Sequence, residues 1–178
     1  MTRVIRAALT ALAIVSATAG CNNDPAANIA HDSVMHDNPV NRVLPEGESL
    51  LLRTDFSDDK AWRETLAAVN QFYDSEGVEY GLNVVDTPDF QAVTARDLEK
   101  LLTSQYYVYI VDELTIRDPN HPILAVDNSG GGEPGAGLPT FRILPREVGE
   151  VEVNLTLANM DFEDFASAVD ADGVFRGF

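Results

Sequence analysis

Four aspartates in this 178-residue sequence follow closely on apolar runs that predict β-strands: Asp55, Asp86, Asp112 and Asp127. The carboxyl ends of parallel strands share one edge of an open α/β sheet, where ligand sites lie, so we expect the four carboxylates to meet there. Converging carboxylates suit Mg²⁺, which prefers hard oxygen ligands and keeps waters for a phosphorylated partner. A Mg²⁺-dependent phosphoryl-transfer enzyme is therefore one hypothesis for the function.

The same aspartates have a simpler interpretation. Asp often follows strands because it turns the chain and caps the next helix. No lysine lies near the end of the strand predicted over 140–144 to neutralise a phosphoryl group, and Asp55 lacks the D-x-D spacing of aspartyl phosphohydrolases. We therefore favour capping over metal binding and assign no catalytic residue.

Arginine supplies a second set of candidate site residues, Arg53, Arg142 and Arg176, among the nine basic residues of 48–178. Each guanidinium can bind a carboxylate or phosphate ligand through two parallel hydrogen bonds. Each can instead pair with an internal acid, for which Asp55 and the acids of 161–164, beginning with Asp161, are the candidates. We favour internal ion pairs that hold the C-terminal segment against the sheet edge.

Other residues capable of chemistry give weaker signals. The glycine-rich stretch 129–137 lacks the G-K-[ST] ending of a phosphate loop and precedes a strand, so we expect a flexible loop. His121 is the only histidine of 48–178, and no G-x-S-x-G motif presents a serine, which disfavours a Ser-His-Asp site. Five aromatic residues could form a binding platform, but we assign them to the core or to packing of the C-terminal tail against the domain: Trp62, Phe162, Phe165, Phe175 and Phe178.

The N-terminal residues 1–20 have the features of an export signal. Arg3 and Arg6 precede an apolar, uncharged stretch over 7–15, and small residues follow it. The uncharged run up to Cys21 is shorter than the roughly 20 residues that cross a bilayer. We therefore expect a cleaved signal peptide and no lasting transmembrane helix.

Cys21 is the only cysteine, so the chain has no internal disulfide framework. It ends the sequence T-A-G-C, which resembles a bacterial lipobox, although Thr18 stands where leucine is usual. The residues 17–19 also fit an A-x-A site, whose cleavage would release a soluble product. We expect lipid attachment at Cys21 and a place in the cell envelope, with soluble secretion as the alternative.

The segment 21–47 is rich in Asn, Asp, Pro and Ala and has no apolar period, which predicts a disordered tether. Within it, a His-Asp pair recurs five residues apart, beginning at His31 and at His36. Imidazole and carboxylate can bind a divalent metal weakly, but we interpret the pairs as part of a polar linker.

From residue 48 the sequence alternates between strand and helix signals. Apolar runs predict strands over 50–52, 80–85, 106–111, 122–126 and 140–144. The residues Trp62, Leu66, Val69 and Tyr73 fall on one face of a helix that should end near Gly77.

Capping residues and a proline also indicate where further helices begin. Thr94 with Asp97 resembles a capping box, Pro145 suits the first turn of a further helix, and Asp161 with Asp164 caps a last one. We predict a single α/β domain over 48–178 with about five strands, mostly parallel, flanked by helices. The connection between the third and fourth strands fits either a hairpin or a crossover.

Several stretches of the chain resemble an uncharacterised bacterial family of unknown function that is common in actinomycete genomes. They are R-T-D-F-S-D-D at 53–59 with Trp62, V-D-E at 111–113, F-R-I-L-P at 141–145, N-L-T-L-A-N-M-D-F-E-D-F-A at 154–166 and D-G-V-F-R-G-F at 172–178. The resemblance covers 48–178 and implies a fold unit without an established activity. Most members begin close to this domain, so the leader is a departure.

Strong acidity limits the partners of the protein. The 29 Asp and Glu residues against 12 Lys and Arg give a formal charge of −17, which deepens once Arg3 and Arg6 are removed. Nucleic acids and anionic membranes are bound through Lys and Arg, so we exclude nucleic acid and expect membrane contact only through the lipid. Acidity speeds association with a basic partner. We therefore favour a non-enzymatic binding module for a basic protein, without a cofactor.

Overall fold

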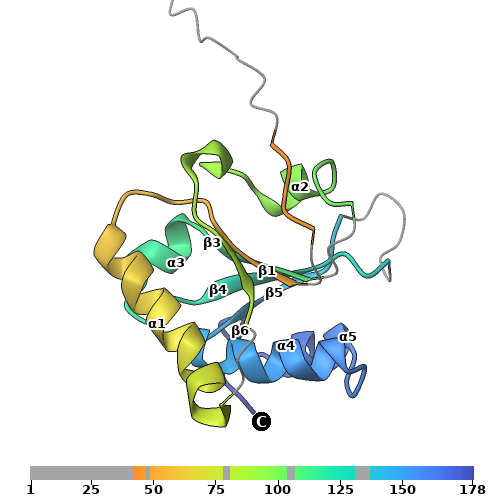
Figure 1. Ribbon diagram of the computed structural model, residues 1–178. Helices are drawn as coiled ribbons and strands as arrows, with labels where there is room; N and C mark the ends of the chain where they lie inside the picture. Colours follow the sequence, from red (N-terminus) through yellow and green to blue (C-terminus); the bar gives the residue numbers. More distant parts are fainter. Residues whose placement is uncertain (1–41, 47–48, 78–80, 104–106, 131–136) are drawn as a thin grey trace, which may run out of the picture. The chain divides into compact units, whose positions relative to one another are not determined.

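The computed structural model describes residues 42–46, 49–77, 81–103, 107–130 and 137–178, all within the compact unit Pro39–Phe178. One six-stranded sheet has the order β2-β1-β3-β4-β5-β6 (Figure 1). Its strands are β1 Ser49–Arg53, β2 Asn83–Val85, β3 Tyr107–Val111, β4 Ile123–Asp127, β5 Thr140–Ile143 and β6 Val174–Phe175. The predicted single α/β domain is confirmed, and the short β6 is a strand that the sequence did not reveal.

The strands run mostly in one direction, as predicted. β1 is parallel to β2 and to β3, whereas β4 is antiparallel to β3 and to β5, and β6 is parallel to β5. β4 alone therefore points the opposite way. The connection from β3 to β4 thus joins antiparallel strands, which settles the alternative that the sequence left open.

Helices connect the strands at positions that their caps define. The helices are α1 Asp59–Glu76, α2 Ala95–Leu98, α3 Glu113–Arg117, α4 Val148–Thr156 and α5 Phe162–Ala166, with 3₁₀ turns η1 Pro88–Phe90 and η2 Pro145–Glu147. The Asp58 carboxylate accepts hydrogen bonds from the first-turn N–H groups of α1, and left-handed Gly77 ends this helix. The predicted capping boxes at α2 and α5 are both present.

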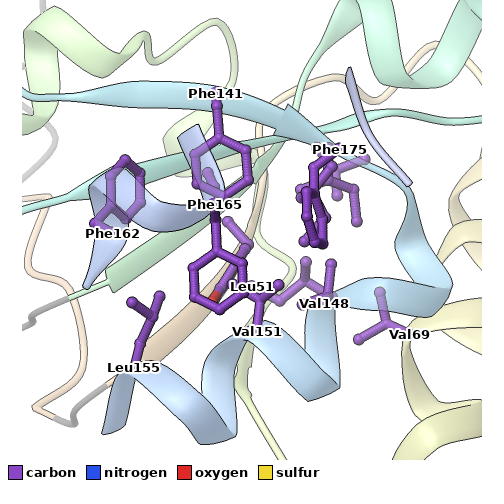
Figure 2. Packing of buried hydrophobic residues seen from close by; sticks show 14 of the residues in the cluster. Leu51, Val69, Phe141, Val148, Val151, Leu155, Phe162, Phe165 and Phe175 are labelled. Atoms are coloured by element: carbon purple, nitrogen blue, oxygen red, sulfur yellow. The ribbon is translucent and has the colours of Figure 1, made fainter. Parts of the chain in front are cut away.

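The two faces of the sheet carry separate cores. Helices α1, α4 and α5 cover one face, where Leu51 and Tyr109 point; Figure 2 shows Val148, Val151 and Leu155 of α4 beneath the phenylalanines of this core. On the other face η1 and α2 pack on Leu50 and Val108. This alternation of strand residues between faces follows from the two-residue period of a β-strand.

The aromatic residues of the C-terminal half belong mainly to the first core. Phe165 and Phe175 are 1% and 2% exposed, and their rings meet edge to face at 5.5 Å. Phe178 contacts both rings but remains largely exposed. The expectation of core and tail-docking roles therefore fits these residues.

The N-terminal predictions are mostly outside the described residues, including the signal peptide, Cys21, His31 and His36. Within the stretch expected to be tether, however, Leu44 is buried in the second core, and the Arg42 side chain donates to the Asp89 carbonyl. In the part of the chain that the structure covers, no helix is long and apolar enough to cross a membrane.

Candidate binding cleft at the carboxyl edge of the sheet

The connections that leave β1 and β2 cover opposite faces of the sheet. α1, between β1 and β2, packs in the first core, and α2, between β2 and β3, packs in the second. In an open α/β sheet, a crevice forms at such a switch in direction, outside the carboxyl ends of the central strands. In this fold that position lies beyond β1 and β3.

A cleft of about 780 Å³ occupies this position. The loops that follow β1, β2 and β3 supply its lining: Thr54, Asp55, Phe56, Ser57, Gln91, Ala92, Val93, Thr94, Asp112, Glu113 and Leu114. Three of these side chains are acidic and none is basic. The lining therefore favours a cationic group over a phosphate.

Backbone hydrogen bonds hold the three loops together. The N–H groups of Thr54 and Asp55 both donate to the Val111 carbonyl, at 2.9 and 3.2 Å. The Ala92 N–H donates to the Thr54 carbonyl at 2.9 Å, and the Asp55 carboxylate accepts from the Ser57 N–H at 2.7 Å. The cleft is thus built on paired backbone groups rather than on an unsupported loop.

One wall of the cleft contains a residue in a disfavoured conformation. The Val93 N–H donates to the Phe90 carbonyl, and Gln91 has φ −54° and ψ 133°, which define a type II turn with Ala92 at its third position. That position normally takes glycine. Ala92 has φ 60°, a conformation that costs a non-glycine residue about 1–2 kcal/mol.

Asp112, which lines the cleft, is bound by an arginine. Arg142 donates to both carboxylate oxygens, at 2.9 and 2.6 Å, and the Thr115 N–H donates to one of them. Burial raises the pKa of Asp112, but the hydrogen bonds from Arg142 and Thr115 outweigh it and hold the pKa below its usual value. Asp112 therefore stays ionised, paired, and positioned as the N-cap of α3.

A second arginine binds Asp86. Arg53 is only 4% exposed and pairs with Asp59 at 2.7 Å and with Asp86 at 3.3 Å. Its guanidinium also lies 4.4 Å from the ring centroid of Phe56. The Trp62 indole N–H donates to the other Asp86 oxygen at 2.9 Å. This cluster joins the ends of β1 and β2 to the first turn of α1.

The four aspartates do not converge as expected. Asp127 ends β4, whose antiparallel register places it opposite Tyr107 at the start of β3 and so at the other edge of the sheet. Asp86 does not line the cleft, whereas Asp55 and Asp112 do. No group of three or more His, Cys, Asp or Glu residues in the described segments is arranged to hold a metal ion. The arrangement expected for Mg²⁺ is therefore not formed by these four carboxylates.

The three candidate arginines, Arg53, Arg142 and Arg176, are each paired, but with other acids than the expected ones. Arg53 reaches Asp55 only through the backbone carbonyl, at 3.0 Å. Arg176 pairs with Asp170 and Asp172, and the hydrogen bond from Arg176 lowers the pKa of Asp172 to about 2. Asp161 instead caps α5 together with Asp164. The ion pairs of Arg176 thus lie within the C-terminal segment, which is joined to the sheet through the pairing of β6 with β5.

Of the remaining candidate residues, those that the structure describes do not line the cleft. His121 hydrogen-bonds through Nδ1 to the Thr115 carbonyl at 2.8 Å, and its Nε2 lies 4.0 Å from Glu64. Of the glycine-rich stretch, 131–136 lies outside the described residues. Neither His121 nor the described residues of that stretch, 129–130 and 137, line the cleft.

Sequence reasoning missed two parts of this site. The turn at 90–93 has no polar motif beyond the Thr94 cap that follows it, and α3 has only five residues, too few for a helical period. The available signal for α3 was Asp112 followed three residues later by Thr115, whose N–H it caps.

Comparison with known proteins identifies the family but no characterised relative. No curated protein matches the chain. A family model described as "Domain of unknown function (DUF6924)" matches residues 48–178, so the chain belongs to this family.

Proposed function

We propose that the domain is a non-enzymatic binding module whose cleft receives a Lys or Arg side chain from a basic protein partner. The observation that carries the proposal is the lining of the cleft, which has three acids and no base. A cation that enters such a cleft exchanges hydration for carboxylate contacts, and no basic residue is among the residues that line the cleft.

The individual acids are unequally available to a partner. Asp112 is engaged by Arg142. Glu113 pairs with Arg117 at 2.6 Å, but both side chains are more than 60% exposed, and such surface pairs contribute little energy. Among the described residues, no Lys or Arg side chain forms an ion pair with the Asp55 carboxylate. Asp55 and Glu113 are therefore the two side chains that we assign to the partner.

The charge of the whole chain acts in the same direction. A formal charge of −17 attracts a basic protein over distance and speeds encounter, while the cleft supplies the local contact. Lipid attachment at Cys21 remains part of the proposal and would hold the domain at the cell envelope, where that partner would be met.

A charge-matched titration tests this function. The purified chain is titrated with hexalysine at low salt, and binding is followed by calorimetry and by NMR shifts of backbone amides. D55N/E113Q should weaken binding about fivefold, the equivalent of about 1 kcal/mol for lost ion pairs.

The control E150Q/E163Q removes the same charge from exposed residues of α4 and α5 that do not line the cleft. It should weaken binding less than about twofold, because only general attraction is reduced. Equal weakening by the two variants, or amide shifts that avoid 54–57 and 112–114, would show that the cleft does not bind the peptide.

A further inference from the structure

We propose that the partner segment carries an aliphatic side chain two residues from its basic side chain, and that Leu114 receives it. This inference rests on the proposed function and specifies the partner. It follows from a second hollow beside the cleft, of about 500 Å³, which shares Glu113 and Leu114 with it and is completed by Arg117, Asp118 and Pro119.

Leu114 is the exposed apolar residue of α3. Its side chain is 48% exposed, whereas Ile116 is 6% and Thr115 is 0% exposed. Leu114 lies on the surface where the two hollows meet. An aliphatic ligand group covering it would remove apolar area from water, which favours binding.

The exposed position of Leu114 is fixed by its neighbours. The Asp112 carboxylate accepts from both the N–H and the hydroxyl of Thr115, at 3.0 Å each. The Thr115 hydroxyl also contacts the Pro122 carbonyl, and Arg142 holds Asp112 from the other side. With Thr115 anchored in this way, α3 cannot rotate to bury Leu114 without breaking these bonds. The leucine is therefore preorganised for an external contact, which lowers the entropy cost of binding.

The chemistry of the joined surface indicates which kinds of side chain the partner presents, and the geometry of an extended segment indicates their spacing. Asp55 lines the cleft, Leu114 lines both the cleft and the hollow, and Pro119 lines the hollow beside charged side chains. An extended segment presents residues i and i+2 on one side. Basic and aliphatic side chains at this spacing can therefore enter the cleft and cover Leu114 together.

Two peptides of equal charge test the inference. One is an octapeptide that repeats Gly-Lys-Gly-Leu, and the other repeats Gly-Lys-Gly-Ser. The unmodified chain should bind the leucine peptide about five- to tenfold more tightly, since covering a partly exposed leucine gives only part of the energy of full burial. L114S should reduce this preference below about twofold, while L114M should retain it because the side chain keeps its apolar volume.

L157S is the matched control, because Leu157 is also exposed, at 64%, and lines neither hollow. It should leave the peptide preference unchanged. Equal binding of both peptides by the unmodified chain, or an equal loss of preference in L157S and L114S, would overturn the inference. The proposed function fails separately, if D55N/E113Q binds the serine peptide as tightly as E150Q/E163Q does.

Discussion

Arg142 on β5 and Asp112 at the end of β3 are joined by two parallel hydrogen bonds, although β4 lies between their strands in the sheet. The guanidinium also donates to the Pro122 carbonyl, just before β4, at 3.1 Å. One arginine thereby fixes the ends of neighbouring strands and the carboxylate that lines the cleft. The pair is partly buried, with side chains 20% and 26% exposed.

Replacing Arg142 should destabilise the domain. R142M leaves the Asp112 carboxylate partly buried without its cation, and loss of one partner from such a pair costs about 2–4 kcal/mol. Urea unfolding followed by fluorescence of Trp62, the single tryptophan, measures the change. K60M removes a cation from an exposed pair of α1 and should cost less than about 0.5 kcal/mol. A loss for R142M no larger than this would contradict a structural role for the pair.

The same pair should make stability depend on pH. The lowered pKa of Asp112 means that the folded state favours the ionised form, so its contribution is fully present above the unfolded value of about 3.9. It is lost as the pH falls below that value and through the lower folded pKa. The free energy of unfolding should therefore differ most between the unmodified chain and D112N near neutral pH, and the difference should shrink below about pH 4.

D74N, at an exposed residue of α1, supplies the reference for an Asp→Asn change away from this pair. Urea titrations at pH values from about 3 to 7 give the required free energies. If the free energies of unfolding of D112N and the unmodified chain differ by the same amount over this pH range, the ionised Asp112 carboxylate does not stabilise the fold in the way proposed.

Much of the fold could be predicted because local signals and global packing agree. The Trp62, Val69 and Tyr73 stripe does face the first core, and the Thr94 capping box does begin α2. Such agreement between patterning, caps and packing is typical of natural sequences. The bounds of four predicted strands lie within one residue of the observed ones, whereas the strand predicted over 80–85 is observed as Asn83–Val85.

The site was harder to predict, because it depends on strand direction and on pairing between distant residues. The antiparallel β4 moves Asp127 to the far edge, and nothing in its own residues specifies that direction. Arg142 and Asp112 lie 30 positions apart, and only the fold brings them together. The exposed position of Leu114 could not be predicted, because a single apolar residue in a short helix gives no hydrophobic period.

The contact between α1 and α4 requires glycine at position 149. A Cβ built on Gly149 would lie 2.6 Å from Cγ and 2.8 Å from Cβ of Phe72, closer than side chains approach. G149A should therefore destabilise the domain by about 1–3 kcal/mol through overpacking.

A double-mutant cycle with F72A isolates this steric cause. F72A removes the contact with Cγ at 2.6 Å and leaves the contact with the Cβ of residue 72 at 2.8 Å. G149A should therefore cost about 1 kcal/mol less in the F72A background than in the unmodified chain. Additive effects would mean that the destabilisation has another origin than the ring of Phe72.

The end of α4 offers a stabilising substitution. Ala158 has φ 53°, and the bonds from Asn159 N–H to the Asn154 carbonyl and from Ala158 N–H to the Leu155 carbonyl form a Schellman motif, which normally places glycine there. A158G should raise the free energy of unfolding by about 0.5–1 kcal/mol. A67G, in the exposed middle of α1, should instead lower it by about 1 kcal/mol. A decrease for both variants would contradict the cap assignment.

Substitutions at and near Cys21 test whether a lipid anchors the chain in the cell envelope. If its thiol carries a diacylglycerol, the chain expressed in a bacterial host should partition with membranes, and C21S should move to the soluble fraction with altered gel mobility, because the acyl chains supply the membrane affinity. T18L restores the leucine usual at that position of a lipobox and should raise the membrane-bound fraction. Mass spectrometry of the mature N-terminus separates the alternatives, since a soluble product of A-x-A cleavage begins at Gly20 without a lipid. Identical partitioning of C21S and the unmodified chain would rule out lipid attachment at this residue.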